Sequence, residues 1–388
     1  MYWLGFGPTA GGYLTTSLVI TGVGSCSLLW VILNSPQVFL LYKQKKNKKI
    51  TIVAAATPFS EFVVRLLGSK IKGYKPTLWL PFSSMKNAYH GDKKIPSMNI
   101  YRRVECTMQD GEVLAVDFYP REFRTMPEDR PLIVFIPGVF GMSQDVYSAE
   151  FCQMVHKTLG WRTAVFNRRG YGGMPIKGKR VVGLTSYDDI HEVLGQIQEM
   201  LPSANLYLVG VSLGAANTQR YLSDFNHESI VKAAVTISSP WNAHKVSEVV
   251  KNNPVLRMGI HQYQKKLFKE QLMHDTFNRL LEAKSICPTS VLNTKDNKHF
   301  DHICSTIGLD HAKPEDYYQA LSSYHLVDKI RIPVLSFNSS DDLLIPKEVV
   351  PFSDIEKNRR IVHLQVAGGG HTEYYTGCKA QFVSVVDS

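Results

Sequence analysis

Short apolar runs rich in β-branched residues recur between residues 131 and 371, and turn-forming residues end each of them. Most stretches between these runs have the apolar spacing of an amphipathic helix, as at Ile190, Val193 and Ile197. Strands that alternate with helices predict a mainly parallel sheet with helices on both faces. The runs are PLIVFIPG (131–138), TAVFNRRG (163–170), NLYLVGVS (205–212), AAVTISSP (233–240), PVLSFNSSDD (333–342) and IVHLQVAGGGH (361–371).

Three segments depart from that alternation. Residues 99–120 contain two alternating apolar and polar segments on either side of Asp110-Gly111, which predicts a β-hairpin. Residues 241–330 are rich in helix formers and fall between two predicted strands, which is the position of a lid or cap. The sequence pattern of residues 50–97 predicts no definite helix or strand, so this stretch is interpreted as a connecting segment. The main domain is therefore expected to span residues 98–388, with the helical cap inserted in it.

The first 42 residues contain no Asp, Glu, Lys, Arg or His, and residues 13–33 form a run of 21 mostly apolar residues. A helix of that length crosses a hydrocarbon core of about 30 Å. The run also lacks the positive region that precedes the apolar core of a cleaved signal peptide. We therefore predict a membrane anchor within residues 1–49, with a removed signal or a buried core helix as the alternatives.

A cluster of lysines follows the predicted span, with no charged residue before it; its members are Lys43, Lys45, Lys46, Lys48 and Lys49. The positive-inside rule places such a cluster, and residues 43–388 with it, in the cytosol. Anionic lipid head groups would also attract these lysines. We expect a single-pass protein of the endoplasmic reticulum or another internal membrane. The cytosolic orientation follows from charge alone.

Charge and cysteine content exclude other classes of protein. The formal net charge is +10, but outside the lysine cluster the excess is modest, so no nucleic-acid-binding surface is expected. The six cysteines are scattered without a C-x-x-C pair, which argues against a structural zinc site and gives no support for a disulfide framework. A reducing compartment is the simpler interpretation.

One motif stands where a predicted strand ends and a helix-like segment begins: Gly210-Val211-Ser212-Leu213-Gly214. In a G-x-S-x-G turn of this kind the flanking glycines let strand and helix come close, and the serine is exposed at the edge of the sheet. The helix N-terminus beneath it favours developing negative charge. We interpret Ser212 as a nucleophile; the alternative is a turn that merely links two elements.

A serine hydroxyl needs a base to take its proton, and the base is usually oriented by an acid. Asp341 and Asp342 follow one predicted strand, and His371 follows the next. The carboxyl ends of these strands would bring them to Ser212. Asp342, four residues before Pro346, is the preferred acid, while Asp341 remains the alternative. His371 could instead be an ordinary loop histidine.

A negatively charged oxygen formed by attack on an ester needs hydrogen-bond donors aimed at it. The backbone N–H of Leu213, directly after the serine, is one candidate. The loop after the predicted strand at 131–138 supplies the second: Gly138 lets the backbone turn close to the site, and the N–H of Val139 is preferred over that of Phe140. The alternative is a plain Pro-Gly turn.

Several of these segments together resemble the membrane-anchored branch of the AB hydrolase superfamily, which includes lipases, esterases and phospholipases. The segments are FIPGVFGMSQDVY, AVFNRRGYGG, LVGVSLGAANTQRYL, IPVLSFNSSDD and GGGH. The resemblance implies the α/β-hydrolase fold with an eight-stranded sheet. It also implies Ser212 as nucleophile, Asp342 as acid and His371 as base. Such relatives are often described with the catalytic domain on the far side of the membrane, so the orientation stays open.

Two further motifs accompany the resemblance. Residues 167–173, NRRGYGG, are interpreted as loop architecture beside the site rather than as chemistry. Residues 311–316 fit an H-x-x-x-x-D pattern that some relatives link to acyl transfer, although a chance match is as good an explanation.

The sequence thus predicts a serine hydrolase that cleaves carboxylic esters of lipids, with no metal or organic cofactor. Its expected partners are the lipid substrate and the bilayer, and no nucleic acid. Two alternatives remain: an inactive lipid-binding or scaffold protein on the same fold, and an acyltransferase that uses the same serine.

Overall fold

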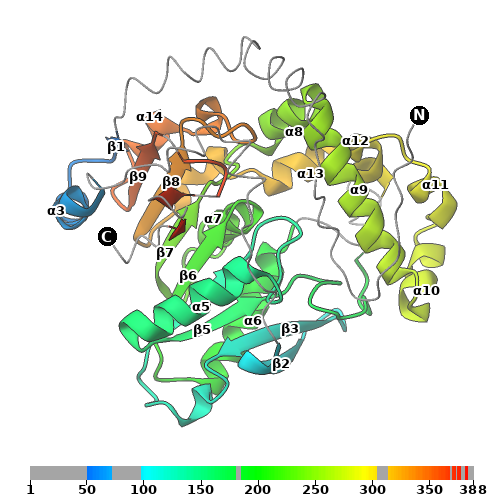
Figure 1. Cartoon of the computed structure of the whole chain (residues 1–388), viewed down its shortest axis with the longest axis horizontal. Coiled ribbons are helices and arrows are strands. Elements are labelled where there is room, and N and C mark those ends of the chain that lie inside the picture. The colour runs from blue at the N-terminus through cyan, green and yellow to red at the C-terminus, as the bar shows by residue number, and fades with distance from the viewer. Residues whose placement is uncertain are drawn as a thin grey trace, which may run out of the picture. The chain divides into compact units, whose positions relative to one another are not determined.

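A nine-stranded sheet organises the described residues (Figure 1). Its strand order is β1-β9-β8-β7-β6-β4-β5-β3-β2. From β9 to β5 all neighbours pair in parallel, whereas β2, β3 and β1 pair antiparallel at the two edges. The strands are β1 (Thr51–Val53), β2 (Arg102–Thr107), β3 (Val113–Tyr119), β4 (Leu132–Ile136), β5 (Arg162–Phe166), β6 (Leu206–Val211), β7 (Val231–Ile237), β8 (Val334–Ser339) and β9 (Ile361–Val366).

The predicted parallel sheet and the hairpin are confirmed, but the expected number of eight strands is wrong. The ninth is β1, which pairs with residues 363–365 of β9 and belongs to the segment interpreted as a connector. The same segment forms helix α3 (Pro58–Ile71), whose Val63 and Leu67 pack in one cluster with Leu364 of β9. Three residues are too few to show the alternation of a strand, so sequence pattern could not find β1.

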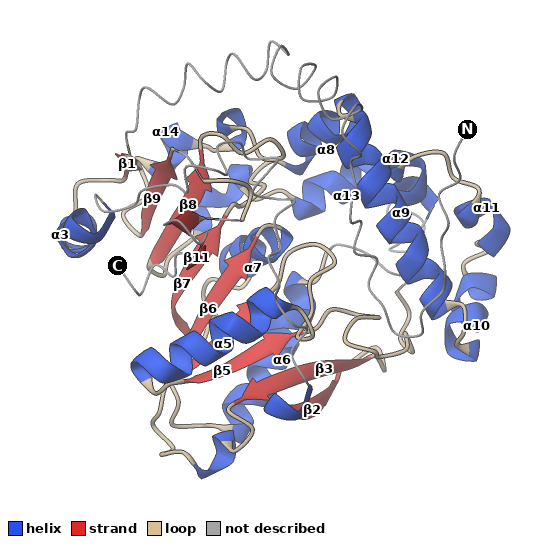
Figure 2. Cartoon of the chain, in the orientation of Figure 1, coloured by secondary structure: helices blue, strands red, loops and turns tan. Residues whose placement is uncertain are grey.

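Helices cover both faces of the sheet, and the sequence of β4 shows how the two layers are separated (Figure 2). Successive side chains of a strand point to opposite faces. Leu132, Val134 and Ile136 therefore join one apolar cluster, while Ile133 and Phe135 join another. Helices α6 (Tyr187–Met200) and α7 (Leu213–Asp224) contribute to the first cluster, and α5 (Val146–Leu159) contributes to the second.

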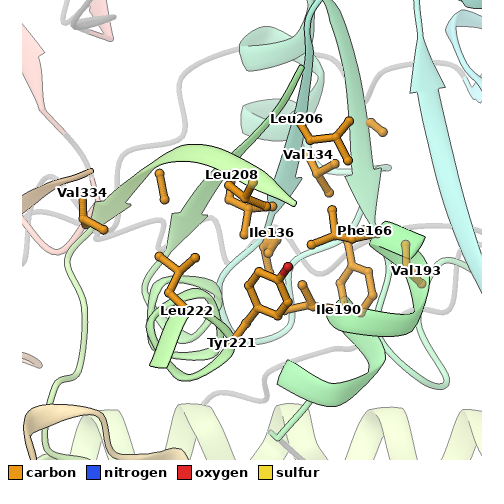
Figure 3. Close-up of a cluster of buried hydrophobic side chains, with 14 of the residues drawn as sticks. Val134, Ile136, Phe166, Ile190, Val193, Leu206, Leu208, Tyr221, Leu222 and Val334 are labelled. Atoms are coloured by element: carbon orange, nitrogen blue, oxygen red, sulfur yellow. The ribbon is translucent and has the colours of Figure 1, made fainter. Parts of the chain in front are cut away.

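The first of these clusters forms the larger core and supports the strand that carries Ser212 (Figure 3). Leu206 and Leu208 of β6 are fully buried there, beside Ile190 of α6 and Tyr221 of α7. Burying an aliphatic side chain of this size contributes about 1.5–3 kcal/mol to folding. The core therefore fixes β6 and α7 relative to each other, and with them the turn between the two elements.

The described residues of the segment 241–330 are largely helical, as expected, and Phe268, Phe277 and Phe300 form a small core there together with Ile176 of the preceding loop. At its two ends the segment approaches the β6–α7 turn, because Ala243 and Tyr317 pack in one cluster with Leu213. Its helices are α8 (Ala243–Asn252), α9 (Pro254–Gln271), α10 (Asp275–Ala283), α11 (Pro288–Leu292), α12 (Asn297–Phe300) and α13 (Pro314–Leu321), followed by a short 3-10 helix η4 (Tyr324–Lys329).

The remaining elements are short. They are the 3-10 helices η1 (Met98–Ile100), η2 (Phe123–Thr125) and η5 (Lys347–Val349), helix α14 (Phe352–Ile355), and a two-stranded sheet of β10 (Tyr375–Thr376) and β11 (Gln381–Phe382).

The computed structural model describes residues 50–71, 98–180, 185–303, 313–367, 369–372, 374–376 and 381–382. The predicted membrane span at 13–33, the lysine cluster and His311 lie outside these ranges. Within the ranges, the helices are too short or too polar to cross a bilayer.

The turn between β6 and α7 is strained and tightly packed. Ser212 has φ +53° and ψ −118°, a combination that costs an ordinary residue conformational energy. A Cβ atom on Gly210 would lie 2.5 Å from the Gly214 carbonyl oxygen, so the two flanking glycines allow strand and helix to meet. The close approach predicted from the sequence is present.

We expect Gly214→Ala to lower the free energy of unfolding by about 2–3 kcal/mol, the upper part of the range for overpacking. The added Cβ would lie 2.6 Å from the Pro137 carbonyl oxygen and closer still to that of Ile136, and neither backbone atom can move without disturbing β4. Gly195→Ala is the matched control, since Gly195 also lies in a helix but has open space around it. That change should stabilise the protein by about 0.5–1 kcal/mol. Urea unfolding measures both; equal effects would contradict the packing described.

Candidate active site

Three side chains that are distant in sequence meet at the carboxyl edge of the sheet. His371 Nε2 lies 2.8 Å from Ser212 Oγ, and His371 Nδ1 lies 2.7 Å from Asp342 Oδ2. The carboxylate of Asp342 is fully buried and the imidazole is 14% exposed. Ser212, at the strained turn, is 6% exposed. The structure therefore brings together the serine, histidine and acid that the sequence predicted.

Asp342 is held by the main chain of its own loop. Its Oδ1 atom accepts hydrogen bonds from the N–H groups of Leu344 at 2.8 Å and Ile345 at 3.0 Å. This leaves Oδ2 for the imidazole. The neighbouring Asp341 carboxylate accepts a hydrogen bond from the hydroxyl of Ser339 instead. The arrangement favours Asp342 over the alternative that the sequence left open.

The backbone of His371 is fixed by a residue that sequence reasoning missed. The Ser238 hydroxyl donates a hydrogen bond to the His371 carbonyl oxygen, and Ser238 follows β7 with a positive φ of 52°. Its own N–H donates to the Phe337 carbonyl at 2.6 Å. Paired serines directly after an apolar run, as in AAVTISSP, were the available sequence signal. Ser238 thus links the histidine loop to the sheet.

The two predicted oxyanion donors have no competing acceptor. Among the described residues, neither the Val139 N–H nor the Leu213 N–H donates a hydrogen bond. Leu213 is the first residue of α7, where backbone N–H groups have no partner within the helix. The backbone of Phe140, the alternative donor, lies beside the Tyr171 hydroxyl. The arrangement favours Val139 and Leu213 as the two donors.

The loop that carries Val139 lies directly against the serine. A Cβ atom added to Gly138 would lie 3.3 Å from Ser212 Cβ, so a side chain at this position would crowd the nucleophile. The Gly141 N–H donates to the Gly138 carbonyl at 3.0 Å, which closes a turn, and Phe140 within it has a φ of +65°. The sequence interpretation of Gly138 as a point of close approach agrees with this contact.

Apolar side chains flank this turn on two sides. On one side Met142 packs with Tyr171 and Leu267. On the other, Val139 packs with Leu321 of α13 and its neighbours. Burial raises the pKa of Asp145, in the same loop, to about 6. The Met142 N–H and the charge of Arg168 oppose that shift. The turn beside Ser212 therefore combines apolar packing with a buried carboxyl group.

The described residues offer no group of three or more His, Cys, Asp or Glu side chains arranged to hold a metal ion. The chemistry that the site's own groups can perform is proton transfer and nucleophilic attack. A serine hydroxyl beside an imidazole that is itself held by a carboxylate is the arrangement used for acyl transfer on several unrelated folds.

Comparison with known proteins agrees with the fold. The family described as the alpha/beta hydrolase fold matches residues 131–377. An Abhydrolase domain-containing protein of Dictyostelium discoideum is 30% identical over 306 residues, which cover 77% of this chain and 75% of the relative.

Two further relatives carry more specific names. Phospholipase ABHD3 of Homo sapiens is 25% identical over 351 residues, covering 87% of this chain and 82% of the relative. Monoacylglycerol lipase of Saccharomyces cerevisiae is 21% identical over 251 residues, covering 63% and 55%. The family match over residues 131–377 and the order of the strands together show that the chain belongs to the alpha/beta hydrolase fold family.

Proposed function

We propose that the protein is a serine hydrolase that cleaves carboxylic esters of lipids through an acyl-enzyme. The observation that carries the proposal is the continuous hydrogen-bonded series from Ser212 through His371 to Asp342. The names of two relatives, a phospholipase and a monoacylglycerol lipase, support lipid esters as the substrate class.

The proposed reaction begins with proton transfer. His371 Nε2 takes the proton of Ser212 as its oxygen attacks the ester carbonyl carbon, and Asp342 stabilises the imidazolium that forms. The N–H groups of Val139 and Leu213 donate to the carbonyl oxygen as it becomes negative. The tetrahedral intermediate then collapses, and His371 gives the proton to the departing alcohol.

The second half of the reaction uses the same groups with water. His371 takes a proton from a water molecule, whose oxygen attacks the acyl carbon attached to Ser212. A second tetrahedral intermediate collapses, the fatty acid leaves, and the proton returns to Ser212 Oγ. Transfer of the acyl group to an alcohol instead of water would share the first half, so analysis of the products separates a hydrolase from an acyltransferase.

The wild-type protein should react with a fluorophosphonate probe, which releases fluoride and leaves a phosphonyl group on Ser212. It should also hydrolyse medium-chain p-nitrophenyl esters. Ser212→Ala removes the nucleophile and should abolish labelling and lower kcat by roughly 10⁵-fold or more. Gel fluorescence and ester hydrolysis measure the two effects. Labelling that persists in the variant, or a wild type inert to the probe and to a panel of lipid esters, would refute the proposal and favour a scaffold protein.

Exchange of each aspartate for asparagine tests the acid. Asp342→Asn should lower kcat by roughly 10³–10⁴-fold, because an amide cannot stabilise the imidazolium and favours the wrong tautomer of His371. Asp341→Asn is the matched control, since its carboxylate accepts from Ser339, and kcat should change little. Steady-state kinetics at neutral pH gives both values. A larger loss in the Asp341 variant would reverse the assignment.

The predicted anchor at residues 13–33 would keep this site beside its lipid substrate. Full-length protein should stay with membranes after alkaline carbonate extraction, whereas a variant that lacks residues 1–42 should be released. If the truncated chain stays with membranes, residues 43–388 must bind the membrane themselves. Release of the full chain would refute a spanning segment.

A further inference from the structure

The segment NRRGYGG, residues 167–173, places a buried arginine behind the oxyanion turn. Arg168 is 2% exposed and follows the end of β5. Its Nη1 atom donates to the Pro137 carbonyl at 3.0 Å, and its Nη2 atom donates to the Gly138 carbonyl at 2.6 Å. The guanidinium carbon lies 4.8 Å from the centre of the Tyr171 ring. A planar guanidinium held in this way fixes two successive peptide groups.

Fixing the Gly138 carbonyl also fixes the next amide. The carbonyl of Gly138 and the N–H of Val139 belong to one peptide group, and in a trans peptide the two point in opposite directions. Arg168 and the Gly141 N–H both bind the carbonyl side. The Val139 N–H is therefore directed away from Arg168 and cannot rotate without breaking both hydrogen bonds.

Most other amides of the turn are already occupied. The Gly138 N–H donates to the Tyr147 hydroxyl at 3.2 Å, and the Phe140 backbone lies beside the Tyr171 hydroxyl. The remaining three follow the same rule: Gly141 N–H donates to the Gly138 carbonyl at 3.0 Å, Met142 N–H to Asp145 Oδ2 at 2.8 Å, and Ser143 N–H to Asn167 Oδ1 at 2.9 Å. Among the described residues, the Val139 N–H thus has no acceptor, whereas four of the other five amides from Gly138 to Ser143 donate to one.

The charge of Arg168 is not neutralised by contact. Its neighbour Arg169 forms ion pairs with Asp189 and Asp110, both at 2.6 Å. No carboxylate of the described residues forms an ion pair with Arg168, which donates its hydrogen bonds to the neutral carbonyl oxygens of Pro137 and Gly138. The Asp145 carboxylate in the same turn feels this charge without direct contact. Burying a cation without a direct ion pair costs free energy, and in a site shielded from water its field is strong. A negative charge that develops nearby would offset that cost.

We propose that Arg168 is a positioning residue of the oxyanion hole: it orients the Val139 N–H toward the developing oxyanion and keeps a positive charge, held without a direct ion pair, behind that peptide. The inference rests on the proposed function and adds to it the role of the segment 167–173. Hydrogen bonding to the Gly138 carbonyl also polarises the peptide, which strengthens the Val139 N–H as a donor.

The chain provides a matched control in Arg162, at the other end of the same strand. Arg162 is 1% exposed and, like Arg168, donates to main-chain carbonyls. Its acceptors are the carbonyl oxygens of Phe123, Arg130, Met126 and Pro127, at 2.6–2.8 Å. Because β5 is parallel to its neighbour β4, Arg162 lies at the amino edge of the sheet, away from Ser212. Substitutions at Arg162 therefore reproduce the loss of a buried guanidinium without touching the oxyanion turn.

The test compares Arg168→Met and Arg168→Lys with Arg162→Met and Arg162→Lys. Arg168→Met should lower kcat by about 10- to 100-fold, less than the roughly 100- to 1,000-fold loss from removing an oxyanion donor outright. KM should change little, because the interaction strengthens only as negative charge forms. Arg168→Lys keeps the charge but cannot hold both carbonyls, so its kcat should fall between those of Arg168→Met and the wild type.

Binding of a boronic acid supplies a readout that a general loss of stability would not move. Its tetrahedral adduct with Ser212 places an oxygen where the oxyanion forms, so its affinity should fall in parallel with kcat in the Arg168 variants. Both Arg162 variants should lose thermal stability while they keep wild-type kcat and boronate affinity. The melting temperatures of all four variants are measured alongside.

Folded Arg168 variants with unchanged kcat and boronate affinity would overturn the inference, as would equal losses in the Arg162 variants. If Arg168→Met does not fold, the pair Arg168→Lys and Arg162→Lys decides, with equal kcat values counting against the inference. A wild-type chain that fluorophosphonate does not label refutes the proposed function itself and this inference with it. Normal wild-type labelling with unaffected Arg168 variants refutes this inference alone.

Discussion

The hydrogen bond between His371 and Ser212 is the contact on which the account of this protein depends. It joins residues that are 159 positions apart in the chain, and it forms because parallel strands bring their carboxyl ends to one edge. Its 2.8 Å length requires both partners to be held from behind. The strained turn after β6 holds the serine, and Asp342 with Ser238 holds the histidine. The sheet core therefore supports the chemistry by fixing backbone positions.

The backbone is also held in place on the opposite side of the serine, in the oxyanion turn. The oxyanion turn has a positive φ at Phe140 and lies so close to Ser212 that a side chain at position 138 would crowd the serine. Such a turn keeps its shape because its peptide groups are bound one by one, by Arg168, by Tyr147 and by neighbouring side chains. Backbone strain and a buried cation are both costly; the strain lies within the turn where an oxyanion would form, and the cation lies directly behind it.

The sequence pattern was sufficient to predict the features that short-range periodicity and turn residues determine. The apolar runs predicted the parallel strands, and the glycines around Ser212 predicted the close approach of β6 and α7. Strand β1 was not predicted, because three residues are too few to show periodicity and only its pairing with β9 makes it a strand. The choices between Asp341 and Asp342 and between Val139 and Phe140 depend on which hydrogen bonds are already taken. Sequence order does not contain that information, and Arg168 and Ser238 were not assigned functional roles for the same reason.

Trapping of the acyl-enzyme tests the central claim most directly. The wild-type protein is quenched with acid milliseconds after mixing with p-nitrophenyl butyrate, digested, and mapped by mass spectrometry. The account predicts a butyryl group on the peptide that contains Ser212, present at early times and lost as the ester is consumed. Rapid release of nitrophenol without that adduct, or with the acyl group on another side chain, would contradict it.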